Sequence, residues 1–284
     1  MQRTFVLGDK WIYYKWYCGK KTADTILVDI VKPLTEKLLH ENLIDQWFFI
    51  RYDDPKSHLR IRFRCKQVSN IGMIINEVKK AIDYFVANDL IWKVRTDTYQ
   101  RELERYGKQT IVDAEQFFFI DSTTCINALN MIEDDELLFL FALKSIDTLL
   151  ESFNYDTKNK IEFVKPNLIA FKKEFNSDKQ LSKQLNKKYA SLKEKTIAFM
   201  TENSDEDFIP LFNLLENKKK KLSQLSTIIL NKKKLEISIN QLLSSYVHMM
   251  INRLFRDQQR LHELVSYDFL SRYYNFLLAK NKQL

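Results

Sequence analysis

The spacing of apolar residues changes along the chain, and this change predicts where strands give way to helices. Near the N-terminus, the aromatic segment Trp11–Gly19 is short and ends at a glycine, which is typical of a strand. Apolar positions then recur at helical spacing from Ile26 to Leu38, which predicts a helix of about four turns. A strand followed by an amphipathic helix therefore opens the predicted fold.

Two further β-rich segments follow, Trp47–Tyr52 and His58–Arg64, and the short linker between them contains Pro55. A turn-type linker between two such segments predicts a hairpin. The apolar spacing next predicts a helix over Ser69–Ala87, and an extended pattern resumes over Ile91–Arg101. The element order is therefore β-α-β-β-α-β, the split unit of ferredoxin-like folds.

The chain after Gly107 is helical in pattern and shows no sequence repeat. The predicted helices are Ile111–Met131, Asp135–Phe153, Lys160–Phe175, Lys179–Met200, Pro210–Leu230, Leu235–Phe255 and His262–Leu278. No linker separates the two regions. The predicted fold class is therefore α+β, with a ferredoxin-like unit over residues 1–107 and a helical portion over residues 108–284, packed together as one compact domain.

Composition narrows the class of protein further. With 45% hydrophobic residues and only four glycines and four prolines among 284 residues, the chain is too apolar to be disordered and too poor in turn residues for a β-sandwich. The start of the chain has no apolar signal core, and no stretch is apolar enough to span a membrane. Cys18, Cys65 and Cys125 lack metal-ligand spacing and are predicted to be reduced and buried. We expect a cytoplasmic protein without a metal site.

The charge pattern does not identify a partner. The net charge of +8 favours an anionic partner, but much of the excess is lysine in runs such as Lys218–Lys221 and Lys232–Lys234. Such runs are usually the solvated face or end of a helix. We therefore expect no direct binding of nucleic acid. The sequence also lacks the glycine-rich motifs that bind nucleotides or flavins, so no cofactor is expected.

One predicted strand carries a regular series of cationic side chains. Alternate residues of a strand face opposite ways, so one face carries His58, Arg60, Arg62 and Arg64. In a split β-α-β-β-α-β unit both helices cover the other face, which would leave the arginines on the open side, about 7 Å apart. Arginine is suited to bidentate binding of carboxylate or phosphate. Alternatively, these arginines form ion pairs with acids on neighbouring strands.

Two more clusters contain candidate functional residues. The segment Asp97–Gly107 contains Arg101 and Arg105 among glutamates, which suits either an anion site or local ion pairs. On a late helix, His248 and Asn252 are four residues apart and therefore share a face, which Arg256 continues. Histidine is the commonest general acid or base near neutral pH, although a lone histidine on a Met-rich helix is often a core residue.

Taken together, four segments resemble one family: W-x-Y-x-K-x-Y near the start, WFFIRYDDPKSHLRIRFR, DTYQRELERYG followed by AEQFFFIDS, and HMMINRLF. The chain resembles the C-terminal, glutamate-elimination domain of class I lantibiotic dehydratases, which also occurs as free-standing thiopeptide-type bacteriocin biosynthesis proteins. The resemblance covers essentially the whole chain, in the family's order.

The resemblance implies a role in modifying a ribosomally made precursor peptide. In this family a glutamylation domain uses glutamyl-tRNA to esterify serine or threonine, and the elimination domain expels glutamate to leave dehydroalanine or dehydrobutyrine. The glutamylation domain is not in this sequence, so we expect a split dehydratase that needs a glutamylation protein in trans. The family also implies a homodimer, and a cyclase as a possible further partner.

The resemblance also implies which residues act. The functional arginines fall on Arg60 and Arg62 and, in the RELERYG segment, on Arg105 or Arg101; we favour Arg105 because it directly precedes the Tyr-Gly turn. The functional histidine falls on His248, as base or as acid. The remaining candidates for substrate contact are His58, Arg64 and Asn252.

The sequence leaves two other functions open. Related free-standing proteins are pyridine synthases, which join two dehydroamino acids in a formal [4+2] cycloaddition and expel the leader peptide. The other alternative is a non-catalytic module that binds an extended peptide at an exposed strand edge.

Overall fold

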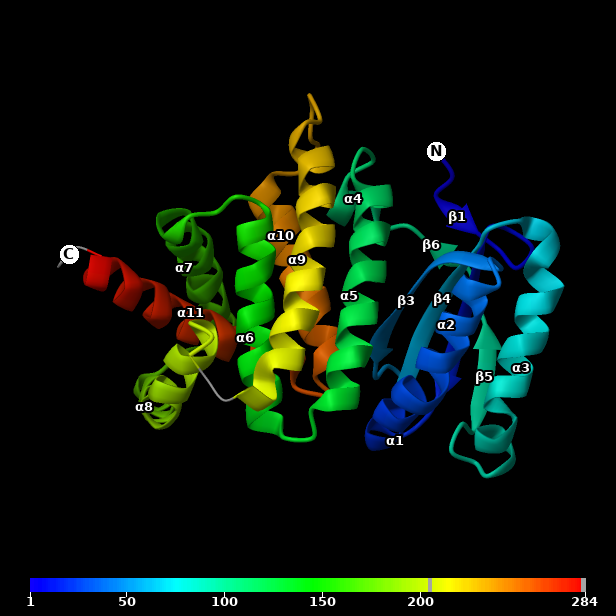
Figure 1. Ribbon diagram of the computed structural model, residues 1–284, viewed down its shortest axis with the longest axis horizontal. Coiled ribbons are helices and arrows are strands. Elements are labelled where there is room, and N and C mark those ends of the chain that lie inside the picture. Colours follow the sequence, from blue (N-terminus) through cyan, green and yellow to red (C-terminus); the bar gives the residue numbers. More distant parts are fainter. Residues whose placement is uncertain (204–205, 282–284) are drawn as a thin grey trace. The chain divides into compact units, whose positions relative to one another are not determined.

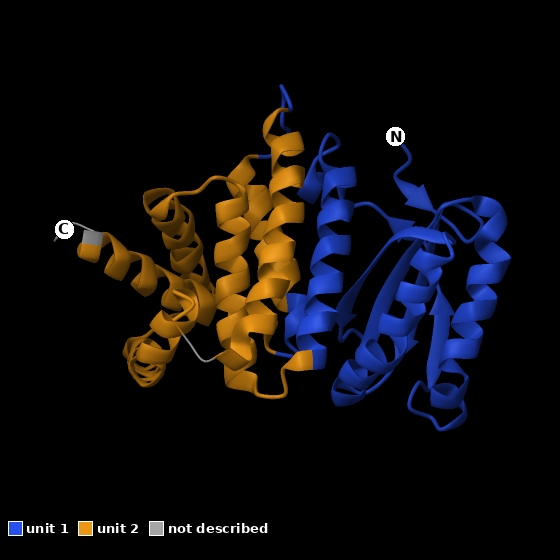
Figure 2. Cartoon of the chain, in the orientation of Figure 1, with its two compact units in different colours: residues 1–130, 232–237, 252–257 blue, residues 131–231, 238–251, 258–284 orange. Residues whose placement is uncertain are grey.

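The computed structural model describes residues 1–203 and 206–281, and its fold is α+β as predicted. By internal contacts the chain divides into two compact units (Figure 2). Unit 1 comprises Met1–Asn130, Lys232–Ile237 and Asn252–Asp257. Unit 2 comprises Met131–Asn231, Ser238–Ile251 and Gln258–Leu284. The first long helix after Gly107 therefore belongs with the sheet, whereas the sequence pattern placed the change at Gly107.

The main sheet of unit 1 has four strands in the order β3-β4-β2-β5, and all neighbours are antiparallel. Its strands are β2 (Trp11–Tyr17), β3 (Ile44–Tyr52), β4 (His58–Cys65) and β5 (Lys93–Thr96). The predicted hairpin is confirmed, because β3 and β4 pair directly across the turn. Along the chain, the strands of this sheet and the helices between them follow in the predicted order, and β1 (Thr4–Phe5) before them was not predicted.

Helices cover one face of this sheet (Figure 1). They are α1 (Lys20–Thr25), the π-helical turn η1 (Ile26–Val31), α2 (Lys32–His40) and α3 (Ile71–Ala87), which follows the 3₁₀ turn η2 (Val68–Asn70). The predicted first helix is thus continuous but widens just before Pro33, a residue that has no N–H to donate to the helix ladder. Leu59, Ile61 and Phe63 of β4 point to this face and are fully buried. Packing these side chains under the helices removes their apolar surface from water, and this stabilises the arrangement.

The extended segment after α3 does not form one strand. It divides into β5 and β6 (Tyr99–Gln100), and β6 pairs with β1 (Thr4–Phe5) in a separate two-stranded sheet. The short helix α4 (Leu103–Tyr106) and the long helix α5 (Ile111–Met131) follow. Gly107 separates these two helices with a φ of 71°, which favours glycine, and a Cβ there would lie 3.0 Å from the Thr110 hydroxyl.

The arginine face of the sheet is not open, which corrects the expectation from sequence. Tyr99 of β6 and Phe118 of α5 pack around Phe48 on this face, with ring centres 5.9 Å and 5.2 Å from that of Phe48. These rings cover the middle of the face, and Arg62 is only 8% exposed. The split-unit pattern predicted the helices on one face but not the later elements that cover the other.

Side chains protect the outer edge of β3, beyond which the described residues add no strand to the main sheet. The amide of Asn252, near the end of α10 (Ile239–Leu254), accepts from the backbone N–H of Arg51 and donates to its carbonyl, each at 3.0 Å. Next along the helix, Nε of Arg253 donates to the carbonyl of Phe49 at 2.8 Å. Backbone groups that would otherwise recruit another strand are therefore occupied.

Unit 2 is helical. Its elements are α6 (Asp135–Ser152), α7 (Thr157–Glu174), α8 (Lys179–Met200), the 3₁₀ turn η3 (Glu206–Phe208), α9 (Ile209–Leu230), most of α10, and α11 (Gln259–Asn281). Helix α7 packs along α11, and α6 packs against α9. Asp134, Asp156 and Asp178 each accept a backbone N–H of the first turn that follows, which explains where α6, α7 and α8 begin. A capping box between Ser238 and Gln241 likewise makes α10 begin four residues later than predicted.

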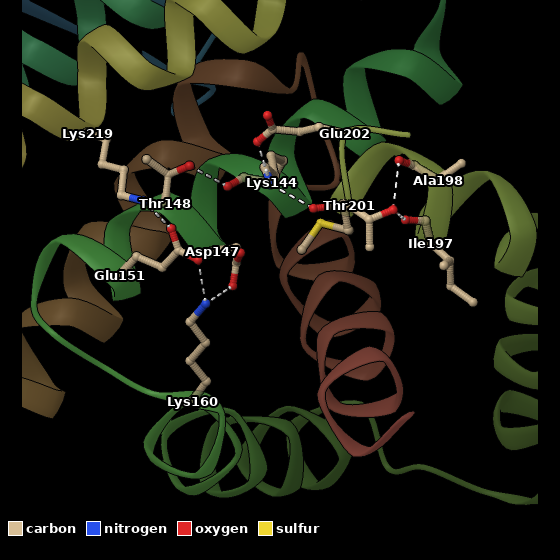
Figure 3. A network of polar contacts seen from close by, with 11 residues as sticks. Lys144, Asp147, Thr148, Glu151, Lys160, Ile197, Ala198, Thr201, Glu202 and Lys219 are labelled. Atoms are coloured by element: carbon tan, nitrogen blue, oxygen red, sulfur yellow. Dashed lines mark hydrogen bonds and ion pairs between the residues drawn. The ribbon is translucent and has the colours of Figure 1, made fainter. Parts of the chain in front are cut away.

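A buried ionic network joins the helices of unit 2 (Figure 3). The ammonium of Lys160 is paired with both Asp147 and Glu151, and Glu151 is also paired with Lys219. The hydroxyl of Tyr274 donates to Asp147 at 2.7 Å. Every charge of this network therefore has a partner.

The cysteines and the hydropathy of the helices complete the description of the fold. Cys18, Cys65 and Cys125 are free and buried, as predicted. Among the described residues, none of the helices combines the length and the hydropathy that a membrane crossing needs.

Candidate active site

Strand register brings the cationic residues of β4 next to aromatic residues of both neighbouring strands. Arg62 is paired with Tyr13 on β2 and with Phe48 on β3, so the three side chains share one face of the sheet. Arg60 lies beside Lys15 in the same way. The predicted alternation of side chains in β4 is therefore confirmed, and the neighbouring strands place aromatic rings beside Arg62.

Arg62 is the most unusual residue of this face. Its guanidinium carbon lies 4.2 Å from the ring centre of Tyr13, 5.0 Å from that of Phe48 and 4.9 Å from that of Tyr99. Within the described part of the chain it forms no ion pair, and its buried Nε has no hydrogen-bond partner. Burial lowers the pKa of Arg62, with the nearby charge of Arg60 acting in the same direction. The ring faces stabilise the cation, but its buried Nε–H remains unsatisfied within the described residues.

Arg60 is held in place by His58 and Tyr52. Its guanidinium carbon lies 3.4 Å from the ring centre of Tyr52, and its Nε donates to Nε2 of His58 at 3.1 Å. The other ring nitrogen of His58, Nδ1, lies 2.7 Å from the carbonyl of Lys56. Because a carbonyl only accepts, Nδ1 carries the proton and Nε2 accepts from Arg60. Burial lowers the pKa of His58, which favours this neutral form.

Two neighbouring cations are neutralised by acids. Lys15 is paired with Asp97, and Arg64 is paired with Asp45 at 2.5 Å. The alternative reading of the arginine face as a set of ion pairs therefore applies to Arg64. It does not apply to Arg62.

Arg101 and Arg105 have different environments. Arg101 is buried, and its Nε and Nη2 donate to the two carboxylate oxygens of Glu115 at 2.7 Å and 2.6 Å. Burial alone would lower the pKa of Arg101, but the hydrogen bond and charge of Glu115 outweigh this effect and raise it. The bidentate face of Arg101 is therefore already engaged.

Arg105 lies on α4 with its side chain 35% exposed, 3.7 Å from the carboxylate of Glu102. The same residue approaches the ring of Tyr106, at 5.6 Å from the ring centre. Burial raises the pKa of Tyr106, and the charges of Arg105 and Arg62 both oppose this rise. Tyr106 therefore lies within the electrostatic reach of both arginines.

His248 belongs to unit 2 and lies on α10. Its Nδ1 is 2.6 Å from Oε1 of Glu263, a residue of α11 that is 2% exposed. The carboxylate only accepts, so Nδ1 carries a proton and donates it to Glu263. Arg260 also approaches Glu263, at 3.3 Å. The contact between His248 and Glu263 fixes the orientation of the imidazole and keeps a proton on Nδ1.

His58, Arg60 and Arg62 share one face of β4, and the rings of Tyr106, Phe118 and Phe48 connect Arg105 to Arg62 within unit 1. Arg64 and Arg101 are engaged by acids, Asn252 is engaged by the backbone of Arg51, and His248 lies in unit 2.

Sequence analysis missed Glu263 and the aromatic residues around Arg62. Tyr13 could have been found, because the W-x-Y-x-K-x-Y alternation places it on the same face of β2 as Lys15. That face lies beside Arg60 and Arg62 of β4. Glu263 gave no signal, because it lies 15 residues from its partner on another helix.

Within residues 1–203 and 206–281, no group of three or more His, Cys, Asp or Glu side chains is placed to hold a metal ion.

Comparisons with known proteins agree with the motifs. The subtilin biosynthesis protein SpaB of Bacillus subtilis is 21% identical over 269 residues, which are 90% of this chain and 25% of SpaB. The nisin biosynthesis protein NisB of Lactococcus lactis subsp. lactis is 29% identical over 127 residues, which are 44% of this chain and 12% of NisB. The chain therefore spans about a quarter or less of the length of these relatives.

Two solved structures share the fold. The tRNA-dependent lantibiotic dehydratase MibB of Microbispora sp. 107891 superposes with a TM-score of 0.78 at 20% identity, covering 98% of this chain and 29% of MibB. The pyridine synthase TbtD from thiomuracin biosynthesis superposes with a TM-score of 0.69 at 12% identity, covering 94% of this chain and all of TbtD. The family model for the C-terminal region of lantibiotic biosynthesis dehydratases matches residues 11–274. Because that match covers nearly the whole chain, the protein belongs to the lantibiotic dehydratase C-terminal family.

Proposed function

We propose that this chain is a carbon–oxygen lyase that eliminates glutamate from glutamylated serine or threonine of a ribosomally made precursor peptide, leaving dehydroalanine or dehydrobutyrine. The observation that carries the proposal is Arg62, a buried guanidinium caged by aromatic rings and lacking a hydrogen-bond partner among the described residues. Family membership supports the reaction type. A separate glutamylation protein supplies the ester in this proposal.

The chemistry needs one base and several cations. The α-proton of the esterified residue is removed, the Cα–H electron pair forms the Cα=Cβ bond, and the Cβ–O bond breaks to release glutamate with a free α-carboxylate. Negative charge develops first on the peptide carbonyl and then on the departing carboxylate. Preorganised donors aimed at such charge are the main source of rate enhancement in sites of this kind.

We assign a role to each candidate side chain of the proposed site. His248 accepts the α-proton at Nε2 and Glu263 positions it, because the carboxylate holds Nδ1–H. Arg62 and Arg60 bind the glutamyl group and its departing carboxylate, and Arg105 contributes a further cation. His58 is a positioning residue, because it accepts from Nε of Arg60. Arg101 serves the structure through Glu115.

The proposal includes a ferredoxin-like assignment for the sheet and its helices. The strand order β3-β4-β2-β5 and the antiparallel pairing support it. It matters for function because the arrangement places β4 in an inner position, where arginines on one face have a strand on either side.

The test is a single-turnover assay. The purified protein is incubated with a synthetic peptide that carries a glutamyl-serine ester, and mass spectrometry follows the loss of one glutamate. We expect loss with wild type and a decrease of about 10²–10³-fold with Arg60→Ala, Arg62→Ala or His248→Ala. Arg3→Ala, a surface arginine paired with Glu104, is the matched control and should leave the rate unchanged. Equal rates for all variants would overturn the proposal.

One observation favours a second function, formation of a pyridine ring by [4+2] cycloaddition. The pyridine synthase TbtD shares the fold over 94% of this chain, with a TM-score of 0.69. A peptide with two dehydroalanines distinguishes the reactions: ring formation without glutamate release would establish the cyclase. Binding of both peptides without turnover of either would identify a non-catalytic module.

A further inference from the structure

Strand β5 is an exposed edge of the main sheet. It pairs with β2 on one side, and the described part of the chain provides no strand on the other. All four of its residues, Lys93–Thr96, are exposed. This edge differs from that of β3, where side chains of α10 occupy the backbone groups.

The direction of the backbone groups on β5 follows from the register. The N–H of Asp97 donates to the carbonyl of its partner Tyr13 at 3.0 Å, which makes this a hydrogen-bonded pair of the antiparallel ladder. Such pairs alternate, so Lys93 and Arg95 also direct their backbone groups toward β2. The N–H and C=O groups of Val94 and Thr96 therefore point outward from the sheet.

The two faces of this edge differ in chemistry. On the arginine face, Lys93 and Arg95 are exposed cations that form no ion pair with any residue the structure describes. The nearby Asp97 is already paired with Lys15. An acidic side chain on an added strand could therefore form ion pairs with Lys93 and Arg95.

The register places Val94 on the opposite face of the edge, and further apolar side chains are exposed in the residues before β5. Val94 is 37% exposed and Trp92 is 46% exposed. Leu90 and Tyr84, which lie in the loop before β5 and near the end of α3, are 38% and 68% exposed. Exposed apolar side chains gathered beside an unpaired strand are typical of a binding surface.

We propose that β5 binds an extended segment of the precursor peptide by strand addition, and that this segment alternates acidic and apolar side chains. Alternation follows from the period of two in a strand, because successive side chains would meet the Lys93 and Arg95 face and then the Val94 face. The inference rests on the proposed function for the identity of the peptide. It adds a docking site for a part of the substrate that does not react.

The binding test uses the full chain and a fluorescent peptide of alternating aspartate and valine, followed by fluorescence anisotropy. Lys93→Glu with Arg95→Glu should weaken binding about fivefold or more, and a lysine–valine peptide should prefer this variant over wild type. Lys183→Glu with Lys187→Glu, on the exposed side of α8, is the control with the same change in net charge and should bind like wild type.

A backbone variant separates strand addition from simple charge attraction. Val94→Pro removes an outward N–H and keeps the ladder to β2, and proline is tolerated at such positions of edge strands. We expect a loss of about fivefold in affinity for one lost hydrogen bond. Unchanged affinity in Val94→Pro, or equal losses in the two double charge variants, would overturn the docking site and leave Lys93 and Arg95 as charges that merely prevent aggregation of the edge.

A kinetic experiment separates this inference from the proposed function. Glutamate release is measured on a short glutamylated peptide and on the same peptide extended by the aspartate–valine segment. If the docking site exists, the extension lowers KM in wild type, and Lys93→Glu with Arg95→Glu abolishes that advantage. No glutamate release from either peptide would contradict the proposed lyase, while anisotropy would still report on binding at β5.

Discussion

The arginine face of unit 1 and the ionic network of unit 2 both bury cations, but they treat them differently. In unit 2, Lys160 has two carboxylate partners, and the phenol of Tyr274 further satisfies Asp147. In unit 1, Arg62 is also buried but contacts ring faces and no acid within the described residues. A buried charge that is paired is neutral or favourable for the fold, whereas an unpaired one is costly. This difference is consistent with a structural role for the network of unit 2 and with the anion-binding role that we propose for Arg62.

Breaking the paired region should have the largest effect. Lys160→Met leaves Asp147 and Glu151 without their shared cation, so the free energy of unfolding should fall by about 3–5 kcal/mol. Chemical denaturation measures the change. Lys158→Met, on an exposed position two residues earlier in α7, is the matched control and should stay within about 0.5 kcal/mol of wild type. A stable Lys160→Met variant would contradict the structural role of the network.

The unpaired region should respond in the opposite way. Arg62→Met keeps a long apolar side chain among Tyr13, Phe48 and Tyr99 and removes a charge that has no ion-pair partner among the described residues. Stability should be unchanged or higher, while the rate of glutamate release should fall about 10²–10³-fold. Thermal unfolding and the single-turnover assay measure the two effects. A loss of stability like that of Lys160→Met would show that Arg62 is structural.

Arg101, which Glu115 engages, and Arg105, which we place in the proposed site, allow the same comparison with smaller expected effects. Arg105→Ala should lower the rate of glutamate release about 10–10²-fold with little effect on thermal unfolding, because its side chain is partly exposed. Arg101→Ala should act on stability instead, since it leaves the fully buried Glu115 without its bidentate partner. The reverse pattern would exchange the roles assigned to the two residues.

The smallest expected effect is a pH dependence in the paired region. Burial opposes ionisation of Glu151, but hydrogen bonds from Lys219 and Lys160 outweigh it and lower its pKa from 4.5 to about 2. A carboxyl whose folded-state pKa is depressed stabilises the fold above its unfolded value, and this contribution is lost as pH falls from about 4.5 toward 2. Glu151 is partly exposed, so solvent screens part of the effect.

Thermal unfolding between pH 7 and pH 2 checks this expectation. Glu151→Gln should be less stable than wild type at pH 7, and the difference should shrink as pH falls through the window. Glu216→Gln on α9, whose pair with Lys220 is exposed, is the control and should show a smaller difference. A constant difference across the range would mean that the charge of Glu151 is not the cause.

Local patterns predicted much of the fold. The hairpin, the helix after it and most of the later helices lie close to their predicted bounds, because apolar periodicity and caps are encoded in neighbouring residues. The predicted strand over Ile91–Arg101 was only partly correct, since β6 leaves the main sheet to pair with β1. That pairing depends on residues almost a hundred positions away, and no local pattern contains it.

The candidate site was predicted in part for the same reason. Alternation in β4 was enough to place Arg60 and Arg62 on one face, and helical spacing was enough to single out His248. Sequence left open the choice between Arg101 and Arg105, and the contact of Arg101 with Glu115 now favours Arg105 for the proposed site. Glu263 could not be predicted, because α11 supplies it to His248 from another helix.

The sequence by itself determined the α+β class, the order of the elements and which side chains share a face, because these depend on the period of a strand or a helix. Only the tertiary structure decided that Arg62 is buried among aromatic rings with no acid from the described residues beside it, and that Arg64 and Arg101 are paired. It also decided that the β5 edge is exposed while the β3 edge is protected. Burial and pairing depend on which distant segments pack together, and that packing sets the free energy of a buried charge.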